Sequence, residues 1–185
     1  MPTFFKASAL AAIAVTTGLA AGSIAPEPAQ AHKRAKAERD IVETAARSDV
    51  HTTLVAAVKA ADLVDTLQSP GPFTVFAPTD TAFAKLPEGT VATLVKPQNK
   101  ATLTKILTYH VVPGRVRSTD LVNLINTGGG AATIKTVSGD TLTARLSGKD
   151  IVITDEKGGV TAVTRANVTT ANGVIHFTDG VFLPA

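Results

Sequence analysis

The chain has 185 residues, and its 18 lysines and arginines exceed its 15 aspartates and glutamates, so the net charge is +3 at neutral pH. It contains no cysteine, which excludes disulfide frameworks, thiolate metal sites and thiol nucleophiles. Aromatic residues make up only 4% of the chain, and outside one short stretch the basic residues are mixed with acids, a composition that argues against nucleic-acid binding.

The first 31 residues have the pattern of an export signal. Lys6 precedes an apolar run of small residues over positions 7–25, and the segment ends in AQA at positions 29–31, the pattern cut by signal peptidases. A membrane span is the alternative, but interrupting glycines and the cleavage pattern disfavour it. We therefore predict a signal peptide over residues 1–31 and a secreted or periplasmic mature protein without a transmembrane anchor. Export without cysteine favours a bacterial envelope protein.

Residues 32–39, HKRAKAER, carry the excess of positive charge. We expect a basic, disordered leader there, the alternative being a tail that holds the protein near anionic lipid or polysaccharide. The remainder, residues 40–185, is predicted to form a single domain. A chain of this length buries a sizeable core without crosslinks.

Helical patterns dominate the first half of this domain. Apolar residues recur at helical spacing between positions 41 and 68, where SPGP ends the region, and again between positions 80 and 108. Between them, Phe73–Pro78 is rich in aromatic and β-branched residues and is predicted to be a short buried strand. Thr79 is then expected to cap the next helix, and Asp80 to place a negative charge at its positive end. Alternatively, Asp80 orients a ligand or partner.

After Gly114 the pattern changes to strands and turns. Apolar and polar residues alternate over positions 141–146, and glycine-containing turn sequences recur up to Asn172-Gly173. The TGGG sequence at positions 127–130 is expected to be a loose connection, because it lacks the preceding strand, the helix and the lysine of a phosphate-binding loop. Helices first and strands later predict an α+β fold with an antiparallel sheet.

Three segments in this order resemble the fasciclin domain. GPFTVFAPTDTAFAKLP at positions 71–87 resembles its first signature segment, ILTYHVVPG at 106–114 its central Tyr-His segment, and ANGVIHFTDGVFLP at 171–184 its second signature segment. The resemblance implies a wedge of antiparallel strands with helices packed along one side. It also implies export and a part in cell adhesion, matrix contact or surface attachment. Some members of the family bind apolar small molecules such as carotenoids.

Tyr109 and His110 are the main chemical candidates. If their segment is a strand, the two side chains point to opposite faces, and the apolar neighbours predict that both are buried and specify the fold. In animal members of the family the Tyr-His segment is implicated in integrin binding. The resemblance therefore marks Tyr109 and His110, together with Asp80 and Thr79, as candidate binding residues.

No catalytic residues and no metal site are predicted. His51 is expected to be exposed and His176 to lie in a strand, and no short ligand spacing joins them or His110 to a carboxylate. Nucleophile elbows, paired-acid signatures and dinucleotide fingerprints are missing from the sequence. We expect a protein that is not an enzyme and that needs no cofactor.

Two functions remain open besides that of an enzyme with an unrecognised site. The first is a noncatalytic exported module that binds a cell-surface or matrix protein or a polysaccharide in adhesion or attachment. The second is a water-soluble carrier of an apolar small molecule, such as a carotenoid or lipid. The small-residue helix predicted at positions 54–64 leaves room for such a ligand.

Overall fold

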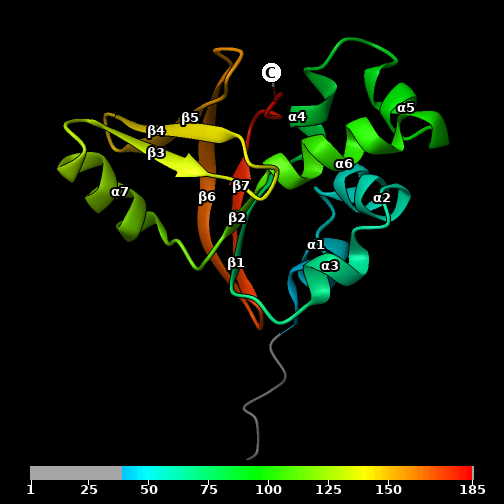
Figure 1. The fold of residues 1–185 in the computed structure, drawn as a ribbon, viewed down its shortest axis with the longest axis horizontal. Coiled ribbons are helices and arrows are strands. Elements are labelled where there is room, and N and C mark those ends of the chain that lie inside the picture. The colour runs from blue at the N-terminus through cyan, green and yellow to red at the C-terminus, as the bar shows by residue number, and fades with distance from the viewer. Residues whose placement is uncertain (1–38, 185) are drawn as a thin grey trace, which may run out of the picture. The chain divides into compact units, whose positions relative to one another are not determined.

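The computed structural model describes residues 39–184 (Figure 1). The predicted signal peptide and residues 32–38 of the predicted leader lie outside these described residues and stay predictions. Within the described range, no helix is long and apolar enough to cross a membrane.

The described chain begins with short helices, as the sequence pattern predicts. In chain order the helices are α1 (Ile41–Ala46), α2 (Thr52–Ala60), α3 (Val64–Gln68), α4 (Asp80–Ala84), α5 (Thr90–Leu94), the 3-10 helix η1 (Pro97–Asn99), α6 (Lys100–Tyr109) and α7 (Ser118–Thr127). The proline and glycine residues after α3 end the first helical region, because proline cannot continue a helix.

The strands form one seven-stranded sheet in the order β2-β1-β7-β6-β5-β4-β3. They are β1 (Phe73–Pro78), β2 (Val111–Pro113), β3 (Ala131–Lys135), β4 (Thr141–Ser147), β5 (Asp150–Thr154), β6 (Val160–Thr170) and β7 (Gly173–Thr178). The α+β class is confirmed. The sheet is mixed, however, because β1 and β7 run parallel, with Phe73 opposite Gly173 and Pro78 opposite Thr178, while the other pairs are antiparallel.

Alternate residues of β1 and β7 face two separate apolar cores, because successive side chains of a strand point to opposite sides. Val75 and Ile175 belong to the helix-side core, which also contains buried residues of α1, α2, α3 and α6. Phe76 belongs to the second core, which contains residues of α7, β3, β4 and β5 together with Phe182 from the C-terminal segment. Figure 1 shows α1–α3 and α7 at opposite sides of the central strands. The predicted burial of β1 is therefore confirmed on both faces.

Helix α7 is an element that the sequence pattern did not predict. Leu121 and Ile125, one helical turn apart, are fully buried against the second core, and the Arg117 N–H donates to the Asp120 carboxylate at the start of the helix. The prediction of a loose connection at positions 127–130 is wrong. Residues 128–130 form a tight helix end in which Gly130 N–H donates to the Ile125 carbonyl over 2.8 Å. Two of these glycines have φ of +72° and +101°, a conformation that favours glycine.

Candidate functional site

Tyr109 and His110 lie at the end of a helix, so the strand that was considered for this segment does not form there. Tyr109 is the last residue of α6 and His110 caps it, directly before β2. Their side chains do not separate to opposite faces, because both pack against the Phe182 ring of the second core, Tyr109 edge-on and His110 stacked. His110 also lines a cavity beside the helix-side core. Only 0% of the surface of Tyr109 and 2% of that of His110 are exposed, so the predicted burial is confirmed.

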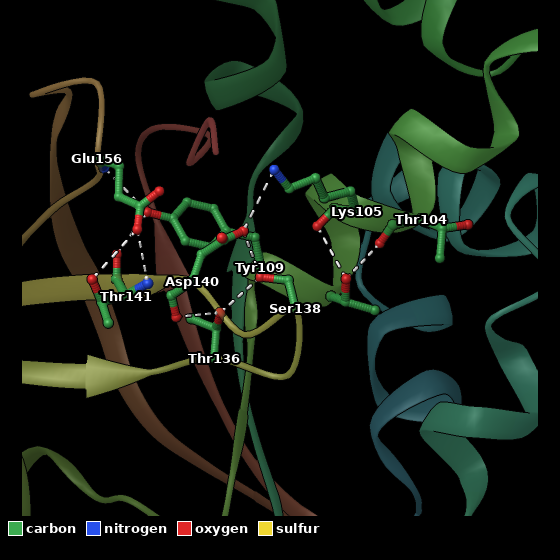
Figure 2. Close-up of polar contacts among 9 residues, drawn as sticks. Thr104, Lys105, Tyr109, Thr136, Ser138, Asp140, Thr141 and Glu156 are labelled. Atoms are coloured by element: carbon green, nitrogen blue, oxygen red, sulfur yellow. Dashed lines mark hydrogen bonds and ion pairs between the residues drawn. The ribbon is translucent and has the colours of Figure 1, made fainter. Parts of the chain in front are cut away.

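The Tyr109 hydroxyl joins two turns of the sheet to α6 (Figure 2). It donates to the Thr141 carbonyl over 2.8 Å and accepts from the Glu156 N–H over 3.1 Å. Burial raises the pKa of Tyr109 to about 12, so the phenol stays protonated at physiological pH. Tyr109 therefore acts as a neutral crosslink and not as an acid or base.

A second set of polar contacts holds the β3–β4 turn against α6 (Figure 2). Lys105 Nζ lies 3.8 Å from an Asp140 carboxylate oxygen, and the Ser138 hydroxyl donates to the same carboxylate over 3.0 Å. Val137, in the middle of this turn, donates its N–H to the Val111 carbonyl. The turn is thus attached both to α6 and to the edge strand β2.

His110 uses both ring nitrogens inside the protein. The Ile106 carbonyl can only accept, so Nδ1 carries the proton and donates over 2.8 Å, and Nε2 accepts from the Phe182 N–H over 2.9 Å. The ring also stacks on Phe182, with centroids 4.7 Å apart and planes at 16°. Burial lowers the pKa of His110 to about 4, which keeps this neutral tautomer at physiological pH. The arrangement fixes the C-terminal segment.

Asp80 is the first residue of α4, so its negative charge lies at the start of that helix as predicted, but its carboxylate caps a different helix. Its carboxylate accepts from the N–H groups of Thr53 and Thr52, over 2.8 and 3.2 Å, and from the Thr52 hydroxyl over 2.7 Å. These groups begin α2, which precedes Asp80 in the chain. Burial alone would raise the pKa of the Asp80 carboxyl, but the hydrogen bonds from Thr53 and Thr52 outweigh it and lower the pKa.

Thr79 is the N-cap of α4, as predicted, but its side chain makes no capping hydrogen bond there. Its hydroxyl instead bonds the Thr81 hydroxyl over 2.8 Å, and its N–H donates to the Thr178 carbonyl over 3.2 Å. Thr79 and Asp80 thus lie just beyond the end of β1. His110 lies beside the middle of β1, where its carbonyl accepts from the Phe76 N–H. No hydrogen bond or ion pair between the described residues joins the two candidate pairs directly, and their part in binding stays a prediction.

We expect Asp80→Ala to lower the free energy of unfolding by about 2 kcal/mol, because removing a helix N-cap costs about 0.5–2 kcal/mol and Asp80 bonds two N–H groups of α2. Urea unfolding at neutral pH measures the loss. The control is Asp65→Ala in the first turn of α3, an exposed carboxylate whose removal should change stability by less than about 0.5 kcal/mol. Equal losses of stability in the two variants would contradict the assignment of Asp80 as the cap of α2.

The two other histidines of the described residues, His51 and His176, are structural, and the expectation that His51 is exposed is wrong. His51 is 1% exposed, its Nδ1 bonds the Ser48 hydroxyl over 2.7 Å, and its ring meets the Phe177 ring edge-on. His176 lies in β7, as expected, is fully buried and donates from Nε2 to the Val116 carbonyl over 2.9 Å. Burial lowers the pKa of both groups. Within residues 39–184, no three or more histidines and carboxylates gather to hold a metal ion.

Two polar residues that sequence reasoning missed connect distant segments. Asn172 accepts from the Ile41 N–H over 3.0 Å and donates to the Leu67 and Ser69 carbonyls over 2.6 and 3.2 Å. Asp155 is 7% exposed and accepts from three N–H groups, including that of Leu183. The only signal at Asn172 was the Asn-Gly pair, which indicates a turn and says nothing of the side chain's partners.

An apolar cavity of about 60 Å³ lies beside the helix-side core. Its walls come from α1, α2, α3 and α6 on one side and from β1, β2 and β7 on the other, and Val137 of the β3–β4 turn completes them. Most of the lining residues are aliphatic. In its apolar lining the cavity resembles a small-molecule site, although it is smaller than most such sites.

Comparison with known proteins gives one family and several relatives. The fasciclin domain model matches residues 49–184. Protein sll1483 of Synechocystis sp. is 47% identical over 78% of this chain and 73% of its own length. The immunogenic protein MPB70 of Mycobacterium bovis is 37% identical over 98% of this chain and 94% of its own length.

A solved structure shares the fold. The FAS1 domain pair from the insect cell adhesion molecule Fasciclin I superposes with a TM-score of 0.70, covering 80% of this chain and 51% of that one. The sequence identity is 21%, so this likeness concerns the fold alone.

Proposed function

Because the chain belongs to the fasciclin domain family, whose model matches residues 49–184, we propose that it is an exported, noncatalytic binding module acting in cell adhesion or in attachment to a surface or matrix. The family match carries the proposal. The fold shared with a cell adhesion molecule agrees with it. The partner on this proposal is a cell-surface or matrix protein or a polysaccharide, met outside the cytoplasm after removal of the predicted signal peptide.

Burial decides how Tyr109 and His110 take part in this function. Side chains that are 0% and 2% exposed do not touch a partner, so their contribution is to hold other segments in place. Tyr109 fixes the turns before β4 and after β5, and His110 fixes the C-terminal segment. We propose that the partner meets exposed residues of these held segments, for example Val137, which is 44% exposed.

The test is binding by the folded protein presented on a surface. Purified protein is immobilised on a sensor, and cells of its host, their envelope polysaccharide and matrix polymers are passed over it. We expect saturable binding of at least one of these, competed by the soluble protein. Heat-unfolded protein on the same sensor is the control. The proposal is refuted if none of the materials binds, or if folded and unfolded protein bind equally.

The second candidate function, a carrier of an apolar small molecule, is favoured by the cavity. Its volume of about 60 Å³ is smaller than the cavity of about 150 Å³ that accommodates benzene in another protein. A carotenoid would therefore have to displace the cavity walls. Native mass spectrometry and an absorption spectrum of the protein purified from its host without detergent test this function. A bound apolar mass supports it, and the bare mass of the chain opposes it.

A further inference from the structure

We propose that the cavity beside the helix-side core binds the end of one unbranched alkyl chain, with the polar head of the ligand remaining outside at the Val137 turn. This inference rests on the carrier function and names the class of its ligand. It follows from the chemistry of the walls, the size of the cavity and the position of the exposed lining residues.

The walls select against polar groups. His110 is in the lining, but both its ring nitrogens are bonded, to the Ile106 carbonyl and the Phe182 N–H. Thr108 is also in the lining, and its hydroxyl donates to the Thr104 carbonyl over 2.7 Å. A carboxylate inside the cavity would therefore find no free donor on either side chain, and burying such a group without a hydrogen bond is unfavourable. The buried part of the ligand must be hydrocarbon.

The volume of the cavity favours an alkyl chain over a ring as the part of the ligand that is bound. A cavity of about 60 Å³ is well below the volume that holds one benzene ring, about 150 Å³. An extended alkyl chain is only one methylene wide, so its terminal carbons can enter where a ring or a rigid polyene cannot. The aliphatic walls, including Leu54, Val58 and Ile175, then make close contact along the chain.

The exposed members of the lining mark the mouth. Val137 is 44% exposed and Thr66 of α3 is also exposed, whereas Val75, Ala77 and Ile175 at the sheet are buried. The Val137 turn forms one wall of the mouth and is attached to α6 through Asp140 and Lys105 (Figure 2). A head group at the mouth stays in water while the alkyl chain of the ligand points towards β1 and β7.

Isothermal titration calorimetry with octanoate and cyclohexylacetate tests whether the cavity prefers an unbranched chain to a ring. The two ions have the same head group and the same number of carbons, so they differ only in the shape of the hydrocarbon. We expect octanoate to bind at least about tenfold more tightly. Ala45→Leu places a larger side chain in the cavity wall and should abolish binding. Ala56→Leu, on the exposed face of α2 and outside the lining, is the matched control and should bind as the parent does.

A surface variant covers the case in which Ala45→Leu fails to fold. Val137→Glu changes a side chain that is already 44% exposed, so the fold should tolerate it. Its carboxylate should repel the octanoate head and weaken binding severalfold at low ionic strength, an effect that salt should reduce. Octanoate binding that neither variant changes would place the ligand elsewhere and overturn the proposal.

Free fatty acids and membrane lipids can both supply an alkyl chain, and cosedimentation with phosphatidylcholine vesicles separates them. Octanoate binding without cosedimentation supports a free chain, and cosedimentation that Ala45→Leu abolishes supports a lipid. If cyclohexylacetate or a carotenoid binds and octanoate does not, the carrier function stands and the alkyl assignment fails. If no apolar probe binds, both fail, and the adhesion proposal is unaffected.

Discussion

Between pH 6.5 and pH 4 the protein is expected to lose about 3 kcal/mol of stability through His110 alone. The unfolded chain binds a proton at His110 near pH 6.5, whereas burial lowers the pKa in the folded protein to about 4. In this window the unfolded state holds more protons, so the free energy of unfolding falls as the pH falls. The difference of about 2.5 pH units, at roughly 1.4 kcal/mol for each, sets an upper limit of about 3.5 kcal/mol, and partial titration at both ends of the window reduces the loss to about 3 kcal/mol.

The structure shows what protonation would break. Nε2 accepts from the Phe182 N–H, and a proton on this nitrogen would place two donors face to face. Asp155 is the charged group that acts on His110, and its negative charge opposes the effect of burial but does not cancel it. Acid should therefore release the C-terminal segment, whose Phe182 ring is fully buried in the second core.

Urea unfolding at pH 7 and at pH 4.5, with His110→Phe as the comparison, measures this effect. The variant cannot titrate, so its stability should depend less steeply on pH, although it is less stable at pH 7 because the Phe182 N–H loses its acceptor. His51 and His176, whose pKa values burial also lowers, should leave a residual slope. If parent and variant show the same pH dependence, the assignment to His110 is wrong.

Asn172→Asp is expected to lower the free energy of unfolding by about 3 kcal/mol, although it changes one amide nitrogen into an oxygen. The amide now donates to the Leu67 and Ser69 carbonyls, and a carboxylate oxygen in its place would face two acceptors. Two hydrogen bonds are lost and buried acceptors are left unpaired, each at a cost of about 1–3 kcal/mol. The substitution should loosen the end of α3, whereas the Ile41 N–H at the start of α1 keeps an oxygen acceptor.

Asn167→Asp is the matched control for this substitution. Asn167 is exposed, and its amide nitrogen donates to the Ser118 hydroxyl, which can rotate and donate to a carboxylate instead. We expect a change of less than about 0.5 kcal/mol in urea unfolding at neutral pH. Comparable losses in the two variants would show that the hydrogen bonds donated by Asn172 do not account for the effect.

The local pattern of the sequence predicted much of the secondary structure, because hydrophobic periodicity and proline are local signals. Helices before residue 109, the buried strand β1 and the alternating strand β4 were all found this way. Helix α7 was missed, since Leu121 and Ile125 make only a short apolar stripe among polar neighbours. The helical pattern predicted helices only up to residue 108 and left a strand open for Tyr109 and His110, but α6 continues through Tyr109.

Contacts between distant segments could not be read from local patterns. Asp80 follows α2 by twenty residues, and the sequence gives no sign that its carboxylate turns back to cap that helix rather than α4. The parallel pairing of β1 with β7 was missed for the same reason, because a run of turn-linked strands predicts antiparallel neighbours. His51 likewise looked exposed because its burial depends on Phe177, far along the chain.

The central position of β7 also bears on how the protein can be made. β1 lies between β2 and β7, and its partner Gly173 follows Phe73 by 100 residues. A chain delivered N-terminus first, from a ribosome or through a translocation pore, therefore cannot complete the middle of its sheet until its last strand has emerged. Contacts of such long sequence separation also make folding slow. The topology itself thus delays completion of the sheet until nearly the whole chain has emerged.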